Sequence, residues 1–364
     1  MDTEEAYDEE LLAKEDELSS SDEANESPPN DIVAFNELRS CSDLKRLYDA
    51  GQLDVQPDYQ RDIVWQPSSQ TRFVDSLAKQ LPIPSMCISL DYKTEKRQIV
   101  DGLQRMSAII KFLSEPKWRL SNLDDIDKKI SNKTVEHIES ELPAIYSRIE
   151  NTVIPITVIR CDLSKRSHQE YLFTIFHRLN TGGMKLNNQE IRNCIYSGDF
   201  NSMLKGVVDS ENFVDLFDID ISRKYRFSNE ELLLRILAFS DDYDGYKGPL
   251  SKHLNAYMAR FRDVNEEQIK EKRDLLDWAI AFVYTNILKE EPLPRLSKAT
   301  TEALFVAVIR NKDKILDQDT KELRTKYKNL RNDELFSIES LKEGLAAPDR
   351  VKSRLARAVE IFSA

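Results

Sequence analysis

Residues 98–113, QIVDGLQRMSAIIKFL, carry the pattern that decides the fold of the first half of the chain. A short β-branched run precedes Asp101, whereas the apolar residues after Gly102 recur with a period near 3.6. The pattern predicts a strand, a tight turn and a helix with one buried face. Arg105 falls in the first turn of that helix, where the helix dipole disfavours a cation unless an anion lies nearby.

Two interpretations of this turn stay open at the level of sequence. In the first, backbone N–H groups and the Arg105 guanidinium hold an anion, Gly102 lets the backbone approach it closely, and Asp101 caps the helix or holds a metal ion. In the second, Asp101 is only a helix cap and Arg105 lies on the surface.

The composition and the hydrophobic periodicity of the sequence change twice along the chain. Residues 1–31 are acidic and Ser-rich, which is typical of a disordered tail. Residues 32–200 mix short β-branched runs with helical periods, which predicts an α/β domain, and residues 203–364 show helical periods only. The predicted fold class is α+β, with an all-helical carboxyl-terminal domain.

The excess negative charge is confined to one end of the chain. The 364 residues carry 52 Lys and Arg against 64 Asp and Glu, and residues 1–31 hold thirteen of those acids and a single base, Lys14. The remainder is therefore neutral, and an anionic ligand is not excluded. The tail is interpreted as a competitor for a basic cleft, as a hook for a partner, or as a solubilising arm.

The sequence gives no support for membrane insertion, secretion or organelle import. No apolar run approaches the 18 or so residues that a spanning helix needs, and the first thirty residues are acidic. The four cysteines form no CxxC pair. We expect a reduced, cytoplasmic protein without a membrane partner.

A second polar cluster lies at residues 57–65, PDYQRDIVW. Tyr59 and Trp65 flank Gln60 and Arg61, so the segment offers a stacking surface and a bidentate donor, as a base or a phosphate diester requires. A half-buried aromatic pair with a surface ion pair is the structural alternative.

A third cluster spans residues 176–193, FHRLNTGGMKLNNQEIRN. Its loop fits a helix stop, and Asn187-x-x-Glu190 fits a capping box that starts the next helix. The polar side chains around the loop suggest a buried hydrogen-bonded network, which either supports the anion site or is purely structural. They are Arg178, Gln189, Glu190, Arg192 and Asn193.

Several enzyme signatures are missing. The chain has no GxxxxGK[ST], GxGxxG, GxSxG or HExxH motif. Its four histidines are scattered and none follows His253, which argues against a histidine-metal nuclease in the carboxyl-terminal domain.

The three clusters, taken in this order, closely resemble the amino-terminal domain of GmrSD-type restriction endonucleases. The resemblance covers residues 32–200 and extends loosely to the helical domain. It implies a ParB/sulfiredoxin-like domain that binds, and in some members hydrolyses, nucleoside triphosphates in phage-defence systems that sense modified DNA. Leu103 departs from the family's DGQQR pattern, which puts hydrolysis rather than binding in doubt.

The resemblance also assigns roles to residues of this chain. Catalysis is assigned to Asp101, Gln104 and Arg105, and Asp101 also to Mg²⁺. The expected nucleotide- or phosphate-binding residues are Tyr59, Gln60, Arg61, Trp65, Gly102, Arg178, Asn180, Thr181 and Gly182. Gln189, Glu190, Arg192 and Asn193 are expected to form the supporting network.

Three functions follow as hypotheses. The first is a defence-associated NTP-binding protein, with a nucleoside triphosphate and Mg²⁺ as ligands, that lacks its own nuclease domain and works with an effector nuclease chain. The second is a non-catalytic module that binds DNA or senses modified DNA and recruits an effector. The third is a DNA nickase that uses Asp101 and Glu190 with a metal.

Overall fold

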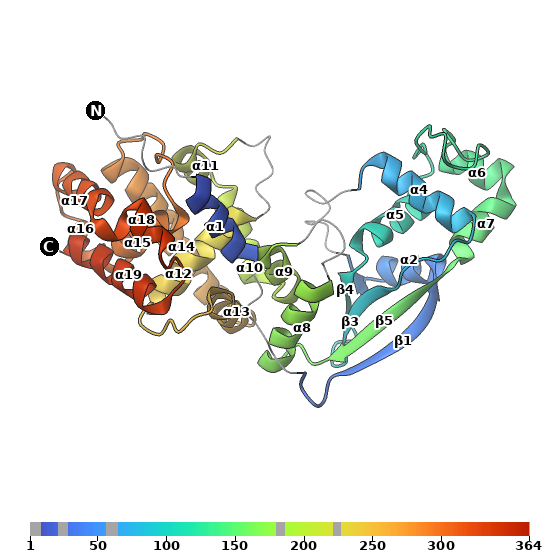
Figure 1. Cartoon of the computed structure of the whole chain (residues 1–364), viewed down its shortest axis with the longest axis horizontal. Helices are drawn as coiled ribbons and strands as arrows, with labels where there is room; N and C mark the ends of the chain where they lie inside the picture. The colour runs from blue at the N-terminus through green and yellow to red at the C-terminus, as the bar shows by residue number, and fades with distance from the viewer. Residues whose placement is uncertain (1–8, 21–27, 56–64, 180–185, 221–226, 364) are drawn as a thin grey trace. The chain divides into compact units, whose positions relative to one another are not determined.

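The computed structural model describes residues 9–20, 28–55, 65–179, 186–220 and 227–363, which form two compact units (Figure 1). Unit 1 comprises residues 1–25 and 186–364, and unit 2 comprises residues 26–185. No helix among the described residues is long and apolar enough to cross a membrane.

Unit 2 is built on a mixed five-stranded sheet with the strand order β1-β5-β3-β4-β2. The β1–β5 and β3–β4 pairs are antiparallel, whereas β3–β5 and β2–β4 are parallel. The strands are β1 (Val33–Ser40), β2 (Leu53–Asp54), β3 (Met86–Asp91), β4 (Arg97–Asp101) and β5 (Val153–Cys161).

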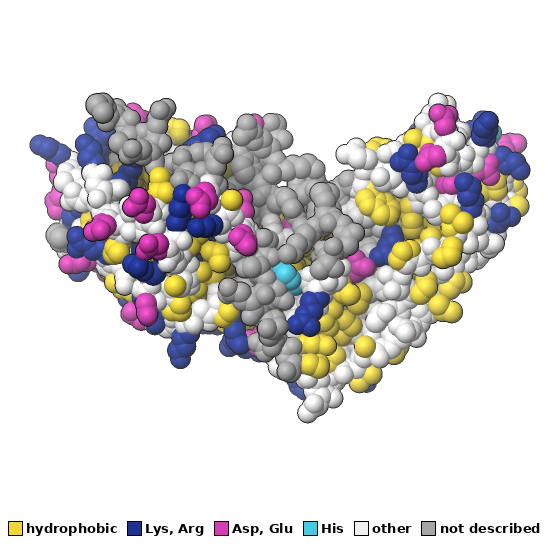
Figure 2. Space-filling view, in the orientation of Figure 1, with side chains coloured by type: hydrophobic (Ala, Val, Ile, Leu, Met, Phe, Trp, Pro, Cys, Tyr) yellow, Lys and Arg dark blue, Asp and Glu magenta, His cyan; other side chains and the backbone are white. Residues whose placement is uncertain are grey.

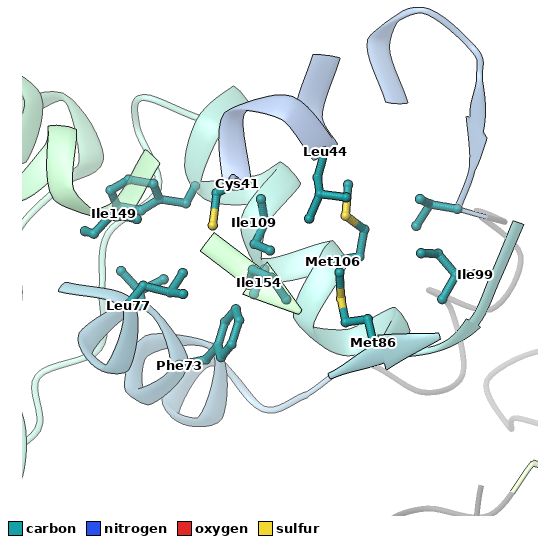
Figure 3. Close-up of a cluster of buried hydrophobic side chains, with 14 of the residues drawn as sticks. Cys41, Leu44, Phe73, Leu77, Met86, Ile99, Met106, Ile109, Ile149 and Ile154 are labelled. Atoms are coloured by element: carbon teal, nitrogen blue, oxygen red, sulfur yellow. The ribbon is translucent and has the colours of Figure 1, made fainter. Parts of the chain in front are cut away.

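Helices pack on this sheet to form one hydrophobic core. They are α2 (Cys41–Asp49), α4 (Pro67–Ala78), α5 (Leu103–Ser114), α6 (Val135–Glu141) and α7 (Pro143–Asn151). Helix α8 (Arg166–Leu179) contacts β4 and contributes no residue to this core cluster. Figure 3 shows how the core draws on several of them, with Phe73 and Leu77 from α4, Met106 and Ile109 from α5, and Ile154 from β5. The helical period after Gly102 therefore places Met106 and Ile109 inside the core, as the sequence predicted.

The entry of the chain into unit 2 is fixed by a buried histidine. His168 of α8 accepts a hydrogen bond at Nδ1 from the backbone N–H of Asp162 (2.9 Å), and its Nε2 lies 2.9 Å from Oδ1 of Asp31. Lys165 also pairs with Asp31. The hydrogen bonds from Lys165 and from His168 lower the pKa of the Asp31 carboxyl to about 2.

Unit 1 is helical throughout its described part. Its helices are α1 (Glu9–Ser20), α9 (Asn188–Ile195), α10 (Asp199–Val208), α11 (Glu211–Phe217), α12 (Ser228–Asp242), α13 (Leu250–Phe261), α14 (Glu266–Phe282), η2 (Val283–Ile287), α15 (Lys298–Arg310), α16 (Lys312–Ile315), α17 (Thr320–Asn332), η3 (Glu334–Phe336), α18 (Ile338–Lys342) and α19 (Pro348–Ser363). Helices α12 and α15 lie at its centre, because every residue from 230 to 240 of α12 and from 299 to 308 of α15 is buried. The α+β fold class and the helical carboxyl-terminal half are confirmed.

The structure differs from the predicted boundaries in two places. Helix α9 packs against α12 and α13, so the helical unit begins near residue 186 rather than after residue 200. The acidic tail was predicted to be disordered over residues 1–31, yet residues 9–20 form α1. Leu11 and Glu15 share one face of that helix and are both buried, which explains why the segment folds.

Candidate functional site

The turn between β4 and α5 has the strand-turn-helix geometry that the sequence predicted. Gly102 is the residue before α5 and has a left-handed φ of 101°. A Cβ on Gly102 would lie 2.5 Å from Cγ of Met86, whose side chain is completely buried. Glycine is therefore required here by backbone conformation and by packing against β3.

Asp101 does not cap α5. Helix α5 has no side-chain cap, and Oδ2 of Asp101 instead accepts a hydrogen bond from Nη2 of Arg105 at 2.9 Å. The Asp101 side chain is 35% exposed, so its carboxylate stays accessible beside the end of β4.

Arg105 is engaged with the protein itself. Besides Asp101, its guanidinium donates through Nη1 to the carbonyl oxygens of Pro84 and Ser85, the second at 3.2 Å. Its side chain is 13% exposed. Arg105 thus joins the segment before β3 to the first turn of α5. These contacts use three of the five N–H groups of a guanidinium, and the other two remain for a ligand.

The structure brings together Gln104 and Trp65, two of the residues expected at the binding site. Oε1 of Gln104 accepts a hydrogen bond from the backbone N–H of Trp65 at 2.8 Å. With Oε1 engaged, the side-chain NH₂ of Gln104 is the group left to donate to a ligand. The Trp65 ring packs edge-on against Phe73 at 5.6 Å between centroids, so it is also part of the core.

Several predicted ligand-binding residues lie outside the described residues, and the structure adds nothing about them. They are Tyr59, Gln60, Arg61, Asn180, Thr181 and Gly182. Arg178 is described and is exposed near the end of α8. The expected site residues that the structure describes are therefore Arg178, Asp101, Gly102, Gln104, Arg105 and Trp65, and the last five lie at the β4–α5 turn or contact it.

Of the four residues expected to form a supporting network, Gln189, Arg192 and Asn193 are joined by buried hydrogen bonds in unit 1. Arg192 is 1% exposed and donates to Oδ1 of Asn255 (2.9 Å), to Oε1 of Gln189 (3.0 Å) and to Oε2 of Glu231 (3.1 Å). Gln189 in turn donates to Oδ1 of Asn193 at 3.0 Å. The network therefore joins α9 to α12 and α13.

Glu190 has a separate, local role. Its carboxylate accepts the backbone N–H of Asn187 at 2.7 Å, while Oδ1 of Asn187 accepts the N–H of Glu190 at 2.8 Å. This is the reciprocal capping box that the sequence predicted at the start of α9.

Sequence reasoning missed the partners of Arg192. Glu231 and Asn255 lie 39 and 63 residues further along the chain. The sequence did contain an indication of Glu231, which is an acid next to the apolar run of α12 and is followed four residues later by Arg235. In the structure Nε of Arg235 lies 3.4 Å from Oε1 of Glu231, and both side chains are buried. Charged residues on the apolar face of a helix are almost never fully buried unless they are paired.

Comparison with known proteins bears on the first half of the chain. Residues 44–197 match the family model of the GmrSD restriction endonuclease, N-terminal domain. The resemblance read from the three clusters is confirmed. The GmrSD match runs from α2 to just past α9, so it contains both the β4–α5 turn and the Arg192 network motif, and it covers less than half of the chain. No curated protein and no solved structure matches this chain.

Metal-binding capacity is limited among the described residues. They contain no group of three or more His, Cys, Asp or Glu side chains placed to hold an ion. Among the described residues, Asp101 therefore belongs to no cluster of three such ligands. Mg²⁺ is commonly bound through one or two carboxylates together with nucleotide phosphates, so Asp101 fits Mg²⁺ that arrives with a nucleotide and does not fit a metal held by protein alone.

Proposed function

We propose that this chain serves a phage-defence restriction system and that its GmrSD-like part binds a nucleoside triphosphate at the β4–α5 turn. The observation that carries the proposal is the arrangement at the amino end of α5, where a left-handed Gly102 precedes a helix whose first turn presents Gln104 and Arg105. The N-terminus of a helix attracts anions through its unpaired N–H groups and its dipole.

Each described side chain at the turn has a distinct role in this proposal. The Arg105 guanidinium, held by Asp101 and by the carbonyl of Ser85, is oriented before a phosphate arrives. Gln104, fixed through Trp65, donates its NH₂ to the nucleotide or to a water molecule. Asp101 is the residue that would hold Mg²⁺, which neutralises phosphate charge when it is bound. Leu103 replaces the glutamine typical of the family, so we propose binding with slow hydrolysis or none.

The second hypothesis, DNA binding without catalysis, uses the same groups on a phosphodiester. The nickase hypothesis receives less support, because the carboxylate of Glu190 is buried and caps α9.

Titration of the full chain with fluorescent ATP and GTP analogues in the presence of Mg²⁺ tests the proposal. We expect Gln104→Ala and Arg105→Ala to weaken binding by about tenfold or more, equivalent to at least ~1.4 kcal/mol. Arg72→Ala is the matched control, because Arg72 lies on α4 and the substitution removes an equal charge from its exposed ion pair with Asp125. Arg105→Lys keeps the charge and tests whether the fork of the guanidinium is needed.

Two results would contradict nucleotide binding at the β4–α5 turn. Equal nucleotide binding by the wild type and both site variants would exclude the β4–α5 turn as the nucleotide site. Loss of duplex DNA binding in those variants, with no nucleotide binding by the wild type, would establish the DNA-binding alternative. Phosphate release from ATP and GTP, with and without DNA, measures hydrolysis separately.

A further inference from the structure

The amino-terminal helix α1 lies on unit 1 although the chain passes through the whole of unit 2 before it returns there. Helix α1 (Figure 1) contacts α9 and α18. The Glu15 side chain of α1 also reaches the start of α15. The helix is acidic, with the sequence EELLAKEDELSS. Figure 2 shows acidic and basic side chains intermixed on the face of unit 1 that carries it.

The central contact is a carboxylate at a helix N-terminus. Oε2 of Glu15 accepts the backbone N–H of Lys298 at 3.0 Å, and Oε1 accepts that of Ala299 at 3.1 Å. Oγ of Ser297 accepts the N–H of Thr300 at 3.0 Å, so the first donors of α15 are satisfied partly from within and partly by α1. Glu15 is 1% exposed, which makes this a built contact between distant segments.

Charge and apolar contacts surround that carboxylate. Lys298 pairs with Asp16 at 3.0 Å and Lys342 pairs with Glu10 at 2.7 Å. Leu11 is buried in a small cluster with Ala299 and Leu341, on which Leu345 packs. The acids and the leucine of α1 therefore match the lysines and the apolar residues beneath them.

The attachment of α1 is nevertheless slight. Its two lysine pairs are largely exposed on the acidic side, at 77% for Asp16 and 64% for Glu10, and exposed ion pairs stabilise little. A helix of twelve residues is marginal in water without a partner surface. Of the described side chains of α1, those of Leu11 and Glu15 are the two that are buried.

We propose that α1 is a detachable strap and that the surface beneath it, formed by the N-terminus of α15 with Lys298, Leu341 and Lys342, is a receptor for an acidic amphipathic helix. In this chain α1 occupies the receptor in cis. The proposal is independent of nucleotide binding.

Hydrogen–deuterium exchange of the full-length chain tests the strap. We compare Glu15→Gln with Asp16→Asn, since each removes one negative charge from α1 but only Glu15 caps α15. We expect Glu15→Gln to speed exchange of the amides of α1, and of Lys298 and Ala299, by about tenfold or more. Asp16→Asn should change it less than about threefold, and the buried amides of α12 should stay unchanged in both variants.

The outcomes separate the strap from simpler explanations. Equal effects of the two substitutions would show that charge alone attracts α1. Faster exchange in α12 together with α1 would show that α1 is an integral part of the core. Either result overturns the proposal.

A second measurement tests the receptor. A synthetic peptide of residues 9–20 is added to the full-length Glu15→Gln chain, and we expect renewed protection of Lys298 and Ala299. The same peptide with glutamine at position 15 should give no protection. If neither peptide protects these amides, the surface is not a receptor for an acidic helix.

Discussion

Arg192 provides the sharpest test of whether the buried network of unit 1 is structural. We consider Arg192→Met, which keeps an unbranched apolar side chain in the space but removes three hydrogen bonds, to Asn255, Gln189 and Glu231. The carboxylate of Glu231, 5% exposed, would then lose its 3.1 Å partner and keep Arg235 at 3.4 Å. Removing one partner of a buried pair costs about 3–5 kcal/mol, and the second arginine offsets part of it. We therefore expect the free energy of unfolding to fall by about 3 kcal/mol.

Urea unfolding of the full chain, followed by far-ultraviolet circular dichroism, measures this change, because unit 1 supplies most of the helix. The matched control is Arg350→Met on α19, whose guanidinium is half-exposed and lies 3.6 Å from an exposed glutamate, and it should cost less than about 0.5 kcal/mol. The double variant Arg192→Met/Glu231→Gln should lose less stability than the sum of the two single variants. A loss below about 1 kcal/mol, combined with loss of nucleotide binding, would refute the structural role and assign the network to ligand binding.

Three further predictions rest on single side chains. Burial raises the pKa of the Glu302 carboxyl to about 7, although Arg235 and Arg354 act in the opposite direction. The stability that this raised pKa contributes is therefore fully present below about pH 4.5 and is lost as the pH rises through about 7. Glu302→Gln should flatten that part of a curve of stability against pH. Gly102→Ala should lower the free energy of unfolding by about 2 kcal/mol, because the new Cβ would clash with Met86. The control is Gly51→Ala, where φ is 66° and a Cβ meets nothing within 4 Å, and thermal denaturation should show a clearly smaller loss for it. Equal losses in the two variants would contradict the clash. Burial raises the pKa values of the Cys41 and Cys87 thiols to about 12. Mass spectrometry should therefore find both thiols unalkylated after iodoacetamide treatment of the native protein at about pH 8, and alkylated after treatment in urea. Rapid labelling of either thiol in the native protein would show that this thiol is accessible.

The part of the fold that the sequence predicted is the part encoded over short distances. The period change at Gly102 gave β4, the turn and α5, and the Asn187–Glu190 spacing gave the capping box of α9. Each of these depends on residues within one or two helical turns of each other, where backbone sterics and local hydrogen bonds dominate.

The contacts that the sequence could not predict join distant segments. The role of Arg105 depends on the carbonyls of Pro84 and Ser85, about twenty residues earlier, and Arg192 depends on α12 and α13. Composition made residues 9–20 look disordered, because the acids outnumber the apolar residues. Their order comes from one buried leucine and one capping carboxylate, whose partners lie near the opposite end of the chain. That the domain is ParB-like stays a prediction.

The docking of α1 also has a consequence for the order of events during translation. Glu15 is made well before its partner, because the N–H of Lys298 that it binds is added 283 residues later. At roughly 5–20 residues per second, α1 waits on the order of half a minute outside the ribosome before its binding surface exists. Unit 2 is contiguous and is finished in that interval, whereas unit 1 closes last. Closing so long a loop in an unfolded chain costs about 4 kcal/mol more entropy than closing a loop of about four residues, and prior folding of unit 2 shortens the flexible path. A nascent chain that stalls before α15 therefore lacks the binding surface of α1 and leaves this helix exposed.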